Sequence, residues 1–213
     1  MPMSPPEIRT LLDRLAAGDE SALGELFALY QVRLRRMIDL RLDHRLNGRV
    51  SASDVVQEVY IDAMKRVQHY RKKPEMPFFV WLRLVANQRL VEVHRQHLGA
   101  GMRNAGKEVS IDRGAWVAAS SMCLAAQLAA NVTSPSHAAM RGERLARIES
   151  ALEGMDLIDR EVLTLRHFEE LSNGEVAEVL GIDKAAASKR YIRALVRLKD
   201  ALEGLPGFAD SEG

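Results

Sequence analysis

Cysteine and long hydrophobic runs are nearly missing from the sequence. Cys123 is the only cysteine among the 213 residues, which excludes an intramolecular disulfide and a thiolate metal cluster and favours a reducing compartment. No apolar run approaches the roughly 20 residues that a membrane-spanning helix needs, and the first residues lack the pattern of a signal peptide. We therefore expect a cytoplasmic protein without a membrane segment.

An excess of charge of one sign is also absent, because the net charge is only +1. The charged residues are nevertheless sorted by segment. Residues 71–103 hold seven Lys or Arg and two Glu, residues 184–199 hold six Lys or Arg and no acid, and residues 141–178 hold ten acids and five Arg. The overall neutrality therefore conceals two basic segments, a distribution typical of nucleic-acid binding.

Motifs that carry catalysis or hold a cofactor are missing too. The sequence contains no phosphate-binding loop, no nucleophile elbow and no paired acids in a pocket context. His94 and His97 are three residues apart on an expected helix, but no further metal ligand lies at a suitable spacing. We expect neither an enzyme nor a bound metal or cofactor.

Strand signals are weak, since aromatic residues make up only 5% of the sequence and no stretch alternates apolar and polar residues for long. Apolar residues recur instead at helical spacing, so the predicted fold class is all-α. The pattern predicts helices over about 7–17 (ending at Gly18), from Asp19 or Ser21 to about 40, from Ser53 or Asp54 to 67, and from Phe78 to His97. We expect these helices to form one four-helix domain with Trp81 in its core.

The segment from Gly99 to about Arg141 differs in composition. It contains the Ala-rich stretch "AWVAASSMCLAAQLAAN", whose small side chains bury little area each, so no independent core is expected. We interpret residues 104–140 as a flexible linker between a first helical domain, 7–103, and a second, 141–205.

One residue is misplaced in the amphipathic stretch "DVVQEVYIDAMKRV", residues 54–67. At 100° per residue, one face is apolar and the other holds Asp54, Gln57, Glu58, Asp62 and Lys65. Ile61 falls in the middle of this polar face. A solvated face gains nothing from isoleucine, whereas a docking face gains apolar area flanked by charges. Ile61 therefore indicates a helix that binds another protein.

A helix-turn-helix is predicted for the stretch "LSNGEVAEVLGIDKAAASKRYIRALVRLKDAL". The short helix "NGEVAEVL" is followed by Gly181, which permits a tight turn, and Asp183 stands at the expected N-cap of the second helix. The buried stripe of that second helix is expected to consist of Ala187, Tyr191, Leu195, Leu198 and Leu202.

A separate stripe of the second helix is basic. It consists of Lys189, Arg193 and Arg197, spaced by four, with Lys184 and Arg190 beside them and no neighbouring acid in the helix to pair with. A solvated basic face is one interpretation. In this motif, however, the second helix enters the major groove, with its first turns against base edges and its cations on phosphate. We therefore predict DNA binding, with Ser188, Lys189 and Arg190 reading bases.

Two stretches resemble bacterial RNA polymerase sigma factors. Region 2 of these proteins is matched by "DVVQE", by "FFVWL" and by the basic helix that follows. Region 4 is matched by "REVLTLRHFEELSNGEVAEVLGI" and "SKRYIRALVRLKDAL". A region 4 match alone is common among regulators, but the pair covers residues 7–103 and 141–204 in the expected order. With no room for further regions, the chain resembles the compact extracytoplasmic-function type.

The resemblance implies roles for the matching residues. The first helix would bind the clamp of the largest polymerase subunit through Asp54, Gln57, Glu58 and Ile61. The helix after "FFVWL" would hold the minus-ten element as single-stranded DNA through Arg83, Gln88, Arg89, Glu92, His94, Arg95 and Arg103, with the 71–79 loop around a flipped base. The helix-turn-helix would bind the minus-35 element through Lys184, Ser188, Lys189, Arg190, Arg193 and Arg197.

Two departures from the family pattern accompany this match. Primary sigma factors carry a Trp pair where this chain has Val80 and Trp81, which agrees with the compact type and implies weaker duplex opening. Gln88 stands where many compact members have Asn, which bears on the base preferred at that position.

The implied partners are core RNA polymerase and promoter DNA. Region 4 would contact the flap of the second-largest subunit, and an anti-sigma factor is a further candidate partner. The alternative function is a standalone helix-turn-helix regulator with a helical sensor or dimerisation domain, which should bind its operator without polymerase. An anti-sigma or adaptor protein is a third alternative, against which the basic recognition stripe argues.

Overall fold

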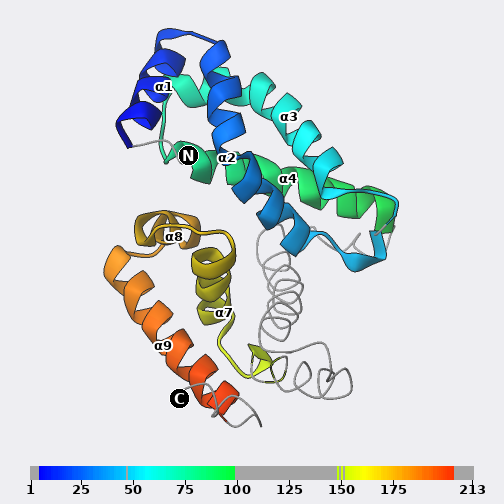
Figure 1. Ribbon diagram of the computed structural model, residues 1–213, viewed down its shortest axis with the longest axis vertical. Coiled ribbons are helices and arrows are strands. Elements are labelled where there is room, and N and C mark those ends of the chain that lie inside the picture. The colour runs from blue at the N-terminus through cyan, green and yellow to red at the C-terminus, as the bar shows by residue number, and fades with distance from the viewer. Residues whose placement is uncertain (1–4, 47, 99–147, 149, 151, 204–213) are drawn as a thin grey trace, which may run out of the picture. The chain divides into compact units, whose positions relative to one another are not determined.

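The computed structural model describes residues 5–46, 48–98, 148, 150 and 152–203, and within these the secondary structure is helical throughout, with no strand. The all-α prediction is thereby confirmed (Figure 1). The chain divides into two compact units, Met1–Arg103 and Asn104–Gly213. The predicted linker 104–140 lies outside the described residues. No helix among the described residues is long and apolar enough to span a membrane.

The first unit contains four long helices, which run from blue to green in Figure 1. They are α1 (Pro5–Ala17), α2 (Ser21–Arg41), α3 (Ala52–Lys72) and α4 (Phe78–Leu98), with the short 3₁₀ helix η1 (His44–Leu46) between α2 and α3. The first helix ends at Gly18, which has a φ of +103°, a conformation that favours glycine. Helices α3 and α4 pack against each other and against α2.

The start of α3 differs from the sequence prediction, which assigned the N-cap to Ser53 or Asp54. The N-cap is Ser51, whose hydroxyl accepts from the Asp54 amide at 3.1 Å. The Asp54 carboxylate accepts in return from the Ser51 amide at 3.1 Å. This reciprocal capping box explains why the helix starts earlier, because it gives hydrogen-bond partners to the backbone amides of both Ser51 and Asp54.

The core of the first unit is aliphatic near its centre and aromatic at one end. Its most buried side chains include Leu34, Met37, Ile38, Val55, Val59, Leu82 and Leu90. The aromatic end contains Tyr70, Phe78 and Trp81, and the Tyr70 and Trp81 rings lie 4.8 Å apart. Trp81 is therefore a core residue, as predicted. Burial raises the pKa of the Tyr70 hydroxyl to about 12, and this hydroxyl donates to the Met76 carbonyl in the loop between α3 and α4.

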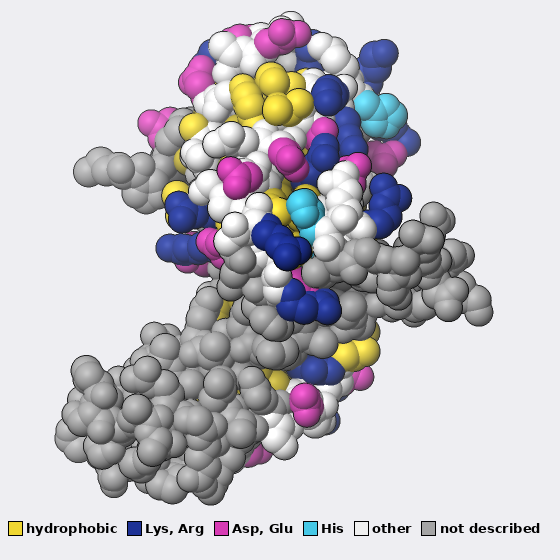
Figure 2. Space-filling model, turned by 90° about the vertical axis from the view of Figure 1, so that its right-hand side faces the viewer, with side chains coloured by type: hydrophobic (Ala, Val, Ile, Leu, Met, Phe, Trp, Pro, Cys, Tyr) yellow, Lys and Arg dark blue, Asp and Glu magenta, His cyan; other side chains and the backbone are white. Residues whose placement is uncertain are grey.

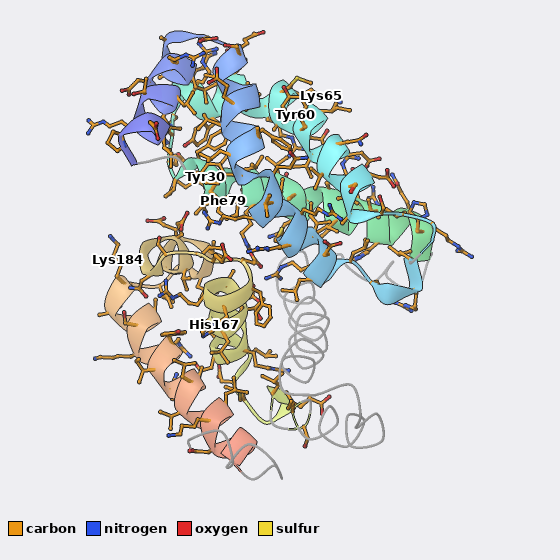
Figure 3. The ribbon with its side chains drawn as sticks, in the orientation of Figure 1. Tyr30, Tyr60, Lys65, Phe79, His167 and Lys184 are labelled. Atoms are coloured by element: carbon orange, nitrogen blue, oxygen red, sulfur yellow. The ribbon has the colours of Figure 1, made fainter. Side chains whose placement is uncertain are left out.

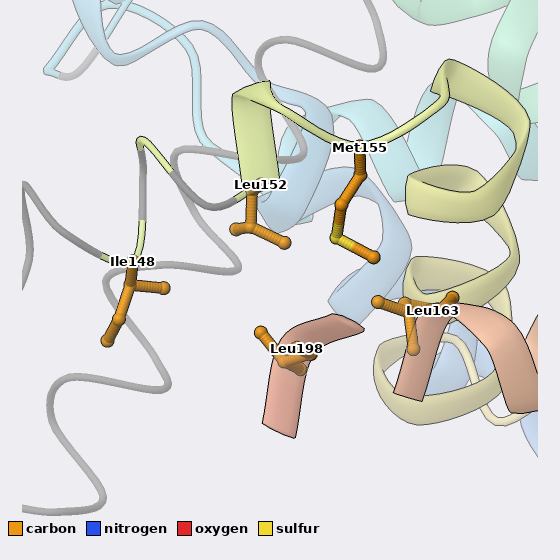
Figure 4. Packing of buried hydrophobic residues seen from close by; sticks show 6 residues of the cluster. Ile148, Leu152, Met155, Leu163 and Leu198 are labelled. Atoms are coloured by element: carbon orange, nitrogen blue, oxygen red, sulfur yellow. The ribbon is translucent and has the colours of Figure 1, made fainter. Parts of the chain in front are cut away.

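The second unit is built around a helix-turn-helix. It comprises α7 (Leu157–Leu163), a π-helical segment η3 (Thr164–Phe168), α8 (Asn173–Leu180) and α9 (Lys184–Glu203). Its core contains Ile148, Leu152, Met155, Leu163, Ala194 and Leu198 (Figure 4). Ala187 and Leu198 of the predicted buried stripe are buried and Tyr191 and Leu195 are half-buried, whereas the side chain of Leu202 lies outside the description.

Two leucines of α4 test whether the aliphatic centre stabilises the first unit. Leu82 is fully buried, and Leu84, two residues on, is 44% exposed. We expect Leu82→Ala to lower the free energy of unfolding by about 2–5 kcal/mol, because it leaves a cavity among packed side chains. Leu84→Ala is the matched control and should change it by less than about 1 kcal/mol. Denaturant unfolding of both variants measures the difference, and equal losses would contradict the burial of Leu82.

Candidate functional site

The exposed face of α3 carries the residues that the sequence singled out for protein binding. Asp54, Gln57, Glu58 and Ile61 are all exposed, so the structure brings these four side chains together on one surface. Ile61 is 46% exposed, and its neighbour Met64 is 45% exposed. Sequence reasoning missed Met64, although a helical projection places it only about 60° from Ile61. The two side chains form an apolar pair with acidic residues on one side.

Figure 2 views the molecule from the side on which α3 lies in Figure 1. It shows a hydrophobic patch on the first unit with Asp or Glu and Lys or Arg side chains around it. An apolar centre with a charged rim is the composition of a protein-binding surface. Lys65, labelled on α3 in Figure 3, is exposed and contributes to the rim.

Asp62 does not belong to this exposed face, in contrast to the prediction from the helical projection. Its side chain is buried, and its carboxylate accepts from the Nε of Arg89 in α4 at 2.9 Å. The Arg89 guanidinium also lies 3.8 Å from Glu58 and 3.0 Å from Glu92. Burial works to lower the pKa of Arg89, but the hydrogen bond that it donates to Asp62 and the charges of the three nearby carboxylates raise it. Arg89 therefore ties α4 to α3.

The residues predicted to hold the minus-ten strand separate into two sets on α4. Gln88, Glu92 and Arg95 share one face of the helix, with Gln88 and Arg95 exposed and Glu92 partly exposed. Arg66 of α3 donates to the side-chain Oε1 of Gln88. The sequence placed Arg83 on the same surface, but Arg83 is only 5% exposed. Arg103 lies outside the described residues.

His94 also points away from the Gln88 side of α4. Its Nε2 accepts a hydrogen bond of 3.2 Å from the backbone amide of Asp43, next to η1. Arg83 and His94 lie on the same side of the helix, about 20° apart in projection. Both side chains therefore support the packing of α4. The sequence prediction had assigned them to the DNA surface, but this side of the helix faces the rest of the first unit.

The helix-turn-helix has the geometry that the sequence predicts. Gly181 turns the chain with a φ of +65°, and the Asp183 carboxylate accepts from the Ala186 amide at 2.8 Å, which caps α9. Helix α8 begins with a capping box that the sequence analysis overlooked, although "SNGE" carries its signature: Ser172 and Glu175 exchange hydrogen bonds. The side-chain Nδ2 of Asn173 donates to the backbone carbonyl of Lys184 at 2.9 Å, which joins the first turns of α8 and α9.

The first turns of α9 carry exposed polar groups. Lys184, Ser188 and Lys189 are exposed, and Figure 3 shows Lys184 at the start of the helix. Ala185 and Ala186 stand between them and leave room for a close approach to a ligand surface. Ile192 and Val196 are 59% and 52% exposed, which the sequence prediction did not include.

Arg190, Arg193 and Arg197 of the predicted minus-35 surface have an acidic partner. The sequence prediction had taken them to be unpaired by acids. Their shared partner is Asp159 of α7, which is fully buried. Arg193 makes two hydrogen bonds with this carboxylate, at 2.8 and 2.9 Å, and Arg190 makes one at 3.0 Å. Arg197 lies 3.7 Å away. Asp159 lies 31 residues before Arg190 in the sequence, so a pattern that considers only the residues of one helix does not include it.

The electrostatics of Asp159 follow from this arrangement. Burial alone raises the pKa of a carboxyl group, but the hydrogen bonds from Arg193 and Arg190 outweigh it and hold the pKa of Asp159 below its usual value. Nearby, the His167 ring of η3 lies within hydrogen-bonding distance, 3.1 Å, of the Tyr191 hydroxyl. Burial, and then the charge of Arg166, lowers the pKa of His167. Helix α9 is thus held to α7 and η3 by polar contacts as well as by its apolar stripe.

The first unit is a helical bundle and the second contains a helix-turn-helix, a motif that many DNA-binding proteins share. The family model "ECF sigma factor" matches residues 5–204, and the chain belongs to this family. Its members are alternative sigma factors that act with RNA polymerase in transcription initiation, and they are non-catalytic subunits. The resemblance seen in the sequence is thereby confirmed.

Several known proteins are similar over nearly the whole chain. RNA polymerase sigma-H factor of Pseudomonas aeruginosa is 26% identical over 92% of this chain and 93% of its own length. ECF RNA polymerase sigma factor SigD of Mycobacterium tuberculosis is 26% identical over 98% of this chain and 90% of its own length. The solved structure of CnrH in complex with the cytosolic domain of CnrY aligns with a TM-score of 0.51 at 23% identity, over 95% of this chain and 98% of that chain, and it supports the all-helical fold.

The lowered pKa of Asp159 predicts a pH dependence of stability. A carboxylate whose folded-state pKa lies below its ordinary value of 3.8 stabilises the folded protein above that pH, and the stabilisation is lost as the pH falls through the lowered pKa. Urea unfolding between about pH 5 and about pH 3 should therefore show a smaller acid-induced loss for Asp159→Asn than for the wild type. Asp200→Asn, at an exposed position of α9, is the control and should match the wild type. An unchanged loss in Asp159→Asn would contradict the pairing.

Proposed function

We propose that the chain directs promoter-specific initiation by binding core RNA polymerase through the exposed face of α3 and promoter DNA through α4 and α9. The observation that carries the proposal is the exposure of Ile61 and Met64 beside Asp54, Gln57 and Glu58. Two large apolar side chains in water are unfavourable for a free protein, whereas in an interface they supply the dry centre around which charges fix the register.

The partner proposed for the α3 face is the clamp of the largest polymerase subunit. Asp54 and Glu58 are acidic and exposed, so they would face cations of the clamp. The hydrogen bonds from the Ser51 hydroxyl and amide lower the pKa of Asp54 and keep its carboxylate charged in the first turn of the helix. The second unit would contact the flap of the second-largest subunit.

The surface proposed for the opened minus-ten strand is the α4 face that holds Gln88, Glu92 and Arg95. Capture of a single strand requires cations along a groove and polar groups that reach unstacked bases. Arg95 would supply the charge, with Arg103 beyond the described residues, and Gln88 and Glu92 would read base edges. We assign Arg83, Arg89 and His94 a supporting role, because their side chains already make contacts within the first unit.

The minus-35 element is the ligand proposed for the start of α9. Lys184, Ser188 and Lys189 are exposed on its first turns, the part of a recognition helix that meets base edges in the major groove. A standalone regulator would use the same helix without polymerase. The proposal therefore also requires that tight promoter binding depend on the core enzyme.

An anti-sigma factor is proposed as a further partner, and the cytoplasm as the place of action. The solved complex of CnrH with the cytosolic domain of CnrY supports this partner class by analogy of fold. The single cysteine is consistent with a reducing compartment.

The direct test is a run-off transcription assay with purified core polymerase and the full chain. Templates come from start-site mapping after overexpression. We expect transcripts from these promoters only when both proteins are present. Tight binding of the promoters by the chain alone, without transcription after core enzyme is added, would instead support the standalone regulator.

Ile61→Asp tests the α3 face. We expect it to abolish binding to core polymerase, because a buried unpaired carboxylate replaces the apolar centre, while thermal unfolding stays close to that of the wild type. Val32→Asp is a matched control, since Val32 is 61% exposed on α2, outside the proposed interface. An unfolded Ile61→Asp protein would mean that Ile61 belongs to the core, and equal loss of binding in both variants would remove the assignment of the face.

Lys189→Ala tests the start of α9. We expect weaker promoter binding by the reconstituted polymerase with unchanged affinity for core enzyme, because Lys189 is exposed and distant in the chain from α3. If Lys189 contacts a phosphate, the slope of log affinity against log salt should fall by about one. Core affinity that drops in parallel with promoter affinity would contradict the assignment.

A further inference from the structure

Asp159 is an unusual acid within the second unit. Its side chain is fully buried at the side of the recognition helix, where a carboxylate is costly unless it is paired. Three cations of one helix, Arg190, Arg193 and Arg197, lie within 3.7 Å of it. We call these four residues the Asp159 cluster. Asp156 lies 3.6 Å from Arg190 as well, and with both acids counted the three arginines still leave this surface with net positive charge.

The contacts hold the arginines at different strengths. Arg193 donates through Nε and Nη2 to the two oxygens of the carboxylate, a two-point contact that fixes the plane of its guanidinium. Arg190 donates through Nη1 to the same carboxylate. The Arg193 and Arg197 side chains remain about half exposed, at 50% and 48%. About half of each side chain is therefore open to solvent, while the Asp159 carboxylate accepts from Arg193 and lies 3.7 Å from Arg197.

The position of the cluster on α9 brings it next to the proposed DNA surface. Arg193 follows Lys189 by one helical turn, about 40° away in projection. Arg190 and Arg197 lie on the flank of α9 that faces α7, where Asp159 is. Arginine loses considerable side-chain freedom when it is fixed on a ligand, and fixing it beforehand removes that cost from binding.

We propose that Asp159 is a positioning residue for sequence-specific DNA binding. It holds the guanidinium groups of Arg190 and Arg193 in set positions beside Lys189, with Arg197 nearby, and offsets one of their positive charges. This arrangement favours a matching minus-35 element over any other DNA. The inference rests on the proposed function of α9. Without Asp159 the arginines would be more mobile and the face more positive, and both changes favour contacts with phosphate at any sequence.

The readout is the ratio of two affinities. The reconstituted polymerase is titrated with a mapped promoter and with the same promoter carrying a scrambled minus-35 element. Asp159→Asn should lower the ratio of the two affinities, and it should steepen the salt dependence on the scrambled template by about 0.9. Asp200→Asn removes the same charge from an exposed position of α9 and should preserve the wild-type ratio. A purely structural ion pair would predict lower stability with the ratio intact.

A second variant keeps the test decisive if Asp159→Asn does not fold. Arg193→Lys retains the charge but cannot make the two-point contact with both carboxylate oxygens. It should also lower the affinity ratio. Where Asp159→Asn does fold, the two losses should not add in the double variant, because both substitutions remove the same contact.

The outcomes separate the inference from the function on which it rests. A wild-type polymerase that does not distinguish the two templates would overturn both the minus-35 assignment and the role of Asp159. A wild-type preference that persists in Asp159→Asn or in Arg193→Lys would overturn the role of Asp159 alone. Additive losses in the double variant would likewise show that Arg193 acts independently of Asp159.

Discussion

A helix in a small bundle can bury only one side of its surface, and this constraint determines which sides of the helices are exposed to other molecules. In the first unit, Leu34, Val59 and Leu82 fill the shared centre, so the opposite sides of α3 and α4 are left for other molecules. In the second unit, the side of α9 with Ala187, Ala194 and Leu198 is buried, and its exposed side carries lysines and arginines. Each binding surface proposed above is the side that packing leaves free.

Both units fix a surface helix with an acid buried against arginine. Asp62 holds Arg89 between α3 and α4, and Asp159 holds Arg193 between α7 and α9. Apolar contacts leave some freedom for a helix to slide or rotate, whereas hydrogen bonds to a buried carboxylate restrict it. Arg193 contacts both oxygens of Asp159, and Arg89 contacts one oxygen of Asp62. The acids therefore contribute to the direction of the exposed side chains as well as to stability.

The sequence was sufficient for most local features, although the capping boxes at Ser51 and Ser172 were not predicted from it. Helical spacing, the φ of Gly181 and the cap at Asp183 depend on neighbours a few residues away, and the all-α fold and the helix-turn-helix followed from them. The same helical projection predicted the exposure of Ile61 correctly and that of Asp62 wrongly, because Arg89 of α4 covers one edge of the polar face. The burial of Arg83 and the pairing of Arg193 depend on where other helices pack, and a single-helix projection contains no such information.

The capping of α8 and α9 has a consequence for how DNA would be approached. A helix that begins with unoccupied amides attracts a phosphate through its N-terminus. Here the Glu175 carboxylate completes the capping box of α8 and Asp183 accepts from the first turn of α9, so both helix starts carry a carboxylate of their own. A nucleic-acid backbone would meet repulsion at these points. Contacts with the DNA backbone would therefore come from side-chain cations, and the affinity for DNA would fall as the salt concentration rises.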